Sequence, residues 1–235
     1  MKRFLSFCLV SVLTVSILSV TALADTNDAA RNAGNNDYSV QEILNRVNEK
    51  YGTDINLIAP DGQKVVITLT AEELESHLES EAKKIAEDNA AAIRLYEDRT
   101  GMSYNSIQWI AADANSNKGE VQADVAGLQR GLQSYVSTQP TWQTAWINVT
   151  LQGIINIDSS NVHKFSQVDK VTCSISTANY LLGWNYSMSS YSYSYLDQMR
   201  TCAVTLTGTE YNPDPQIAPG YIRSFSSTKY VEFYA

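Results

Sequence analysis

The chain has few of the residues from which most enzyme sites are built. It contains two histidines and three cysteines among 235 residues, and only 18% of its residues are charged. The sequence contains no glycine-rich phosphate loop, no G-x-S-x-G nucleophile motif and no dinucleotide fingerprint, which are the local patterns that most directly indicate nucleotide or acyl chemistry. We therefore expect no cofactor and no catalytic residue, and a non-enzymatic role is favoured.

Basic residues are also scarce. The chain has 17 Lys and Arg against 25 Asp and Glu, a net charge of −8. Two of the basic residues, Lys2 and Arg3, lie at the extreme N-terminus, so the remainder is more acidic still. Nucleic-acid binding requires clustered Lys and Arg against the phosphates, and anionic membrane surfaces attract the same residues. The composition weighs against both kinds of partner.

The first 24 residues have the pattern of a secretory signal peptide. Lys2 and Arg3 precede the apolar run Phe4–Val20, and Ala22-Leu23-Ala24 is a small-x-small cleavage site. The run is rich in Ser and Thr and is shorter than the roughly 20 strongly apolar residues of a membrane-spanning helix. We predict cleavage after Ala24, secretion, and a mature chain without a transmembrane segment.

We predict a disordered polar leader over residues 25–37. A mainly helical acidic region is predicted to follow over residues 38–139. In this region, apolar residues at helical spacing predict a helix over Ser39–Tyr51 that ends at Gly52. Two β-prone stretches that flank an Asp-Gly turn predict a small hairpin over residues 55–69. From 103 to 139 the pattern is weaker, and for Val121–Tyr135 a connector and a third helix remain equally open.

The clearest helix is predicted over residues 71–98. Thr70 and Glu73 form a capping-box pattern at its start, and Gly101 ends it. Its apolar stripe recurs at helical spacing and comprises Leu74, Leu78, Ala82, Ile85, Asn89, Ala92 and Tyr96. We expect this stripe to pack on the first helix, on the β region or on a partner chain, so oligomerisation through the helix remains open.

Residues 140–235 change to a period of two and are predicted to form an antiparallel β domain. Alternating runs begin near Ile147, Val171, Cys202 and Tyr230, with turn signals between them. Six or seven strands in this length favour a β-sandwich. The predicted fold class is therefore α+β, with an N-terminal helical region followed by an antiparallel β-sandwich-like domain.

Cys173 and Cys202 both lie on the predicted inward faces of their strands. Because two cysteines in a secreted chain favour one disulfide, we predict a bond between them.

An aromatic run with alternating serines is the most unusual stretch of the chain. Its phase slips at Ser189-Ser190, which predicts a β-bulge there. The rings form a candidate binding ladder, because Tyr and Trp combine an apolar surface with a polar tip. Ordinary strand packing is the competing interpretation. The candidate residues are Trp184, Tyr186, Tyr191, Tyr193 and Tyr195.

Glu73, His77 and Glu81 lie four residues apart on one face of the long predicted helix. They lack the further converging ligand that zinc requires, so a solvated charged face is favoured and no metal site is predicted.

These patterns favour a secreted, non-catalytic binding module whose partner is an extracellular glycan or protein. Two alternatives remain open. One is an extracellular hydrolase that uses loop carboxylates, and the other is a membrane-active or bacteriocin-like protein that uses the Tyr/Ser stretch.

Overall fold

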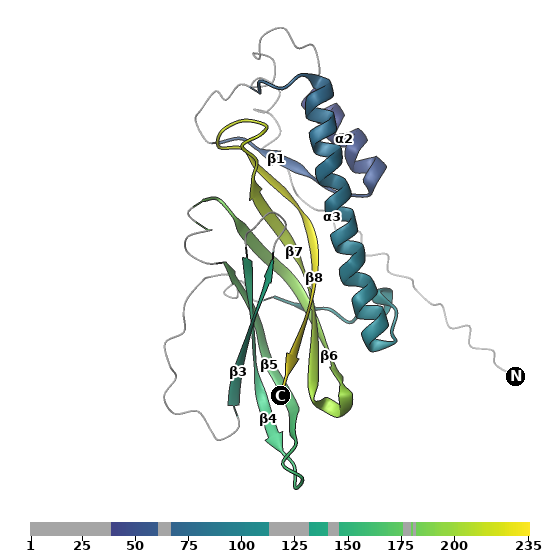
Figure 1. The fold of residues 1–235 in the computed structure, drawn as a ribbon, viewed down its shortest axis with the longest axis vertical. Helices are drawn as coiled ribbons and strands as arrows, with labels where there is room; N and C mark the ends of the chain where they lie inside the picture. The colour runs from purple at the N-terminus through teal and green to yellow at the C-terminus, as the bar shows by residue number, and fades with distance from the viewer. Residues whose placement is uncertain (1–38, 61–66, 113–131, 141–145, 176–179, 181) are drawn as a thin grey trace, which may run out of the picture.

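Two antiparallel sheets and two α-helices make up the described part of the chain (Figure 1). The computed structural model describes residues 39–60, 67–112, 132–140, 146–175, 180 and 182–235. The predicted signal peptide and polar leader lie outside these residues. The helices come first and most of the strands follow, so the predicted α+β fold class is confirmed.

Both predicted helices are present and both end where the sequence indicates. Helix α2 (Val40–Tyr51) has Ser39 as its N-cap, and Gly52 follows it in the left-handed conformation. Helix α3 (Ala71–Thr100) begins with the complete Thr70–Glu73 capping box and is followed by left-handed Gly101. Glycine adopts this conformation without the steric cost of a Cβ atom, which is why the helices stop at these positions.

The apolar stripe of α3 is buried within the chain's own fold. Leu74, Leu78 and Ala82 are fully buried in a core that α3 forms with α2 and with residues of the C-terminal region such as Ile217 and Phe225. Of the three packing partners expected for the stripe, the first helix and the β region are thus the ones that cover it. Oligomerisation through this helix remains a prediction.

The larger sheet has the strand order β1-β8-β7-β6-β2. Its strands are β1 (Asn56–Ile58), β2 (Ile110–Ala111), β6 (Asn185–Leu196), β7 (Thr201–Pro213) and β8 (Ile222–Tyr234). One-turn 3-10 helices, η1 (Tyr104–Ser106) and η2 (Asp197–Met199), precede β2 and connect β6 to β7. The β6–β7–β8 meander forms the centre of the sheet.

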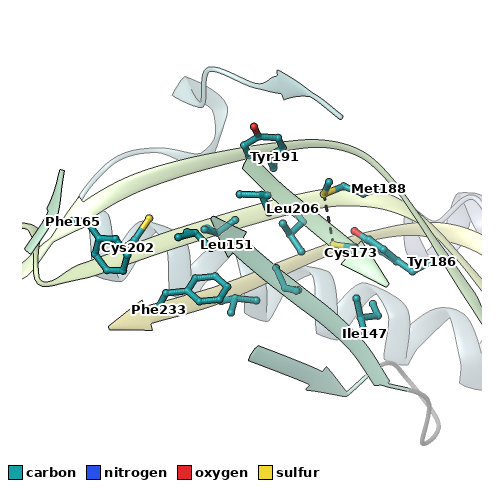
Figure 2. Close-up of a cluster of buried hydrophobic side chains, with 14 of the residues drawn as sticks. Ile147, Leu151, Phe165, Cys173, Tyr186, Met188, Tyr191, Cys202, Leu206 and Phe233 are labelled. Atoms are coloured by element: carbon teal, nitrogen blue, oxygen red, sulfur yellow. Dashed lines mark hydrogen bonds between the residues drawn. The ribbon is translucent and has the colours of Figure 1, made fainter. Parts of the chain in front are cut away.

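The smaller sheet has the order β3-β4-β5 and packs face to face on the lower half of the larger one (Figure 1). Its strands are β3 (Leu132–Pro140), β4 (Trp146–Ile157) and β5 (His163–Ile175). Apolar side chains from both sheets fill the space between them (Figure 2), including Leu151, Phe165, Leu206 and Phe233. This packing is sandwich-like, as the alternation predicted.

Long-range pairing bears on two local predictions. The turn and part of the second stretch of the predicted 55–69 hairpin, residues 61–66, lie outside the described residues. Strand β1 pairs with β8, and Ile67–Leu69 are not in a strand. Leu132–Tyr135, the described end of the stretch for which a connector and a helix were open, belongs to β3. In both cases long-range strand pairing decided the structure, and a local pattern does not report it.

Helix α3 begins on one face of β8 and ends on the opposite face. Side chains two residues apart on a strand share a face, and β7 pairs with β8 without a register shift. Glu81 in the first half of α3 binds odd-numbered Arg223, whereas Arg99 near its end binds even-numbered Glu232. The right-handed twist of long strands explains the change, because the strands rotate beneath a straight helix of about 45 Å.

The middle of α3 covers the edge of β8. The Asn89 amide donates to the Ser226 carbonyl (3.2 Å) and accepts from the Thr228 N–H (2.8 Å). The Asp54 carboxylate accepts from the Ser226 N–H at 2.7 Å. Unpaired N–H and C=O groups on an edge strand invite pairing with other chains. Here the two side chains take the place of a neighbouring strand.

Replacing this cap tests its contribution. We expect Asn89→Ala to lower the free energy of unfolding by about 1–2 kcal/mol, because two backbone groups of β8 lose their partners. Urea unfolding followed by tryptophan fluorescence measures the change. Lys83→Ala, at an exposed position on the same helix, is the matched control and should stay within about 0.5 kcal/mol of wild type. Equal effects of the two substitutions would contradict the capping role.

Candidate functional site

The five candidate aromatic residues do not form one surface. Tyr186 and Tyr191 are buried in the core between the two sheets, where they are 3% and 9% exposed (Figure 2). Tyr193 and Tyr195 are half-buried at the margin of the same core, and Trp184 is also partly exposed. The ladder therefore divides into a packed part and a part that solvent reaches.

A bulge produces this division. The β6–β7 register shifts between Met188 and Ser190, as the phase slip in the sequence predicted. Met188 and Tyr191 consequently both point into the core, although their numbers differ in parity. Gly208 lies opposite the bulge, where an added Cβ would come within 2.9 Å of the Tyr186 ring. A β-bulge re-aims the side chains that follow it, and here it directs the odd-numbered tyrosines to the core face.

Tyr193 and Tyr195 form a preorganised aromatic pair. Their ring centroids lie 5.7 Å apart with an interplanar angle of 62°, an edge-to-face contact that itself stabilises the arrangement. Burial, with a smaller contribution from neighbouring Tyr193, raises the pKa of Tyr195 to about 12. The Tyr195 phenol is thus neutral at physiological pH, and neither phenol has a hydrogen-bond partner within the described residues. The pair presents apolar ring surface together with hydroxyl groups.

Trp184 lies too far along β6 to join this pair. It immediately precedes the strand, whereas Tyr193 and Tyr195 lie near its C-terminal end. At about 3.3 Å per residue, nine residues span about 30 Å. The candidate site is therefore the Tyr193–Tyr195 pair and the part of β6 that carries it.

The predicted disulfide is not present in the structure. Cys173 and Cys202 are both buried free thiols. Cys173 lies on β5, where its Sγ approaches the Met188 Sδ at 3.6 Å, and Cys202 lies on β7 near Phe165 (Figure 2). Both residues do point inward as the alternation predicted, but they lie at different positions along the sandwich. Burial raises the pKa of each thiol to about 12, which makes both poor nucleophiles.

Thiol titration distinguishes the two states. For the chain that begins at Asp25, we expect no reaction with Ellman's reagent under native conditions, because both thiols are buried. In denaturant without reductant, both cysteines should react. A denatured protein that still shows no free thiol would demonstrate the disulfide that the sequence predicted.

A buried ionic network joins α3 to β7 and β8, and the sequence analysis did not detect it. Arg223 has no exposed surface, and its guanidinium contacts Glu81 of α3 at 2.6 Å and Asp214 at 2.5 Å. Nearby, Lys229 pairs with buried Glu210 at 3.0 Å. The buried charges of Glu81, Arg223 and Asp214 therefore connect the helix to the β7–β8 ribbon.

His77 extends the network towards the surface. Its Nε2 lies 3.0 Å from both carboxylate oxygens of Asp214, and its side chain is 13% exposed. The expectation of a solvated charged face is therefore wrong for His77 and Glu81, because the twist of β8 brings Arg223 and Asp214 against that face. Among the described residues no group of three or more His, Cys, Asp or Glu side chains is placed to hold a metal ion.

Opposing effects set the charges in this network. Burial alone raises the pKa of Asp214, but the hydrogen bond with His77 and the charge of Arg223 outweigh it and hold that pKa below its usual value. Burial lowers the pKa of Arg223, whereas Glu81, Asp214 and Glu210 favour its charged form. The arrangement stabilises a fixed geometry of helix and ribbon, since every charge already faces a partner.

The other loop carboxylates are also engaged. Asp158 pairs with Lys164 at 2.9 Å and accepts backbone N–H groups of the β4–β5 turn. Asp197 accepts from Thr201 and contacts Arg99 in the β6–β7 connection. These two residues and Asp214 lie in different parts of the fold and serve local contacts.

A hollow of about 400 Å³ lies between α2 and α3, and its lining of exposed opposite charges includes the Arg46–Glu75 and Lys50–Glu79 pairs.

Comparisons of the chain with protein-family models, with curated proteins and with solved structures find no match.

The pH dependence of stability tests the network. The depressed pKa of Asp214 means that its contribution to stability is present above the pKa of an unfolded Asp, about 3.9, and is lost as pH falls through its lower folded value. We expect Asp214→Asn to lower the unfolding free energy at pH 7 by about 3–5 kcal/mol, because Arg223 loses a partner. The variant should also show a shallower acid-side loss.

Urea unfolding at a series of pH values from neutral to strongly acidic measures both effects. Asp98→Asn, at an exposed position on α3, is the control and should reproduce the wild-type curve. If Asp214→Asn and Asp98→Asn have the same acid-side slope, Asp214 does not carry this part of the pH dependence.

Proposed function

We propose that this chain is exported by its N-terminal signal peptide and acts outside the cytoplasm as a non-catalytic interaction module. The observation that carries the proposal is the half-buried Tyr193–Tyr195 pair at the margin of the sandwich. Paired rings with available hydroxyl groups offer apolar area at a small cost in conformational entropy, which is why Tyr is enriched at binding surfaces. The ligand class is an extracellular glycan or protein.

The rigid surroundings of the pair support this role. Tyr193 and Tyr195 follow the buried residue Tyr191 on the same face of β6, and β7 pairs with β6 along the whole strand. The strand is thus anchored on one side and packed beneath, so the rings are held in position before any ligand arrives. Preorganisation of this kind reduces the entropic cost of binding.

The contacts of the carboxylates and of β6 favour this role over the two alternatives. Asp158, Asp197 and Asp214 each stabilise a local part of the fold, and Glu81 and Asp214 share Arg223. A membrane-active hairpin would have to remove Tyr186 and Tyr191 from the core. None of the helices in the described part of the chain has an apolar stretch sufficient to span a bilayer.

Acetylation of tyrosines with N-acetylimidazole, mapped by mass spectrometry, tests the proposal. In the free protein we expect Tyr193 to react, as should Tyr180 and Tyr234, which are 62% and 64% exposed, whereas Tyr186 and Tyr191 should not. Soluble cell-wall glycan fragments and short extended peptides are then added in turn. At least one ligand class should protect Tyr193 and leave the control residues Tyr180 and Tyr234 reactive. Protection by none of these probes would count against the module.

A further inference from the structure

The second half of β6 is an open sheet edge. Strand β2 pairs only with Ser190 and Tyr191, and Ala112 adds one hydrogen bond from its N–H to the Ser189 carbonyl. Beyond Tyr191, no described strand is hydrogen-bonded to this side of β6, although the strand continues to Leu196. The other side of the same residues is paired with β7 throughout.

The register identifies which backbone groups point towards this open edge. Because Ser189 accepts from Ala112 on the β2 side, Tyr191, Tyr193 and Tyr195 direct their N–H and C=O groups to that side, at the two-residue period of an antiparallel ladder. Ser192 and Ser194 direct theirs to β7. The two tyrosines of the candidate site thus present both their rings and their unpaired backbone groups at the same edge.

The β8 and β5 edges are protected in ways that this edge is not. The β8 edge is covered by β1 and by the Asn89 and Asp54 side chains. Edge strand β5 carries the charged residues Lys164, Asp169 and Lys170. Charges and side-chain caps are the usual protection of an edge against association. Strand β6 has no charged residue or proline between Asn185 and Leu196, so neither charge nor proline protects the strand beyond its bulge.

We propose that this edge binds an extended segment of a partner polypeptide, which adds to the sheet as a strand antiparallel to Ser192–Leu196. This inference deepens the proposed function and rests on it, because it assigns the ligand of the Tyr193–Tyr195 site to the polypeptide class. Strand addition obtains affinity from main-chain hydrogen bonds and specificity from alternate side chains. Here the backbone donors and acceptors of Tyr193 and Tyr195 would provide the affinity, and their rings would provide the specificity.

The surroundings define the chemistry of the segment. Residues opposite Tyr193 and Tyr195 would be β-branched or aromatic, since these form the favourable cross-strand pairs with tyrosine. Asp169 of β5 acts electrostatically on Tyr195, and Asp197, which Arg99 and Thr201 already contact, follows β6 directly. In an antiparallel segment the N-terminal end would lie nearest these carboxylates. A Lys or Arg at that end therefore complements the site.

A second copy of the chain is a poorer occupant. Each copy carries a net charge of −8 and would bring the same two carboxylates to the contact.

Hydrogen exchange of individual amides, measured by NMR on the chain from Asp25, tests the premise and the proposal together. In the free protein the amides of Tyr193 and Tyr195 should exchange rapidly and those of Ser192 and Ser194 slowly. The probe is a pool of acetylated peptides of the form Lys-X-Thr-X-Thr-X, in which X is Val, Ile or Tyr. In excess, the pool should slow exchange at Tyr193 and Tyr195 by about ten-fold.

Two controls separate strand addition from contact with the rings. The same pool N-methylated at the X residues, which removes their backbone N–H donors, should give no protection. Tyr195→Val and Tyr195→Pro both remove one ring, but only the proline also removes the outward N–H, at a position where an edge strand tolerates it. Peptide protection of Tyr193 should persist in Tyr195→Val and be lost in Tyr195→Pro. If Tyr195→Pro does not fold, the methylated pool decides.

Several results would overturn the inference. Slow exchange of Tyr193 and Tyr195 in the free protein at every concentration would mean that the chain itself satisfies the edge. Protection that grows with protein concentration together with a dimeric mass would assign the edge to a second copy. Protection of the two rings by a glycan, with no effect of the peptide pool on the amides, would leave the interaction module standing and remove the polypeptide ligand.

Discussion

The pairing of β7 with β8 is the interaction on which the other elements depend. The two strands pair over thirteen positions without a shift in register, and a ribbon of that length twists strongly. Because of this twist, side chains on one face of the ribbon point in different directions at its two ends. Each end therefore packs against a different element. The smaller sheet covers Val204 and Val231, and the helices cover Phe225, although all three belong to one face. The two cores are therefore two ends of a single twisted surface.

The ionic network lies on that surface at the helical end of the ribbon. A buried pair such as Glu81–Arg223 contributes little net stability over a well-packed apolar pair of the same size, but it strongly disfavours arrangements in which one charge lacks its partner. An α3 that is shifted by one turn would still bury leucine and alanine, but it would leave Arg223 opposite the wrong residue. We infer that the network defines the register of α3 on the ribbon. That register also places Asn89 at the β8 edge.

Local signals were sufficient for the elements and insufficient for their contacts. The capping box at Thr70, the left-handed glycines after both helices and the bulge near Ser189 follow from residue types within a few positions, and the structure contains all of them. The partner of β1, the distance between Cys173 and Cys202, and the burial of His77 depend on how far β7 and β8 twist before other elements reach them. One signal of the network was visible, because Arg223 and Lys229 share the alternating face of β8 that also carries Phe225 and Val231.

The open part of β6 presents a conflict between two physical demands. A strand that must accept another backbone cannot carry the prolines or charges that keep edges apart, so it bears an inherent risk of association. Alternating Ser and Tyr limits that risk, because the rings are half-buried against the sandwich and the serines are small and polar. The acidic charge carried elsewhere on the chain adds repulsion between copies without obstructing the edge. If β6 binds a partner segment as proposed, composition, burial and charge would together keep its edge accessible and limit association between copies.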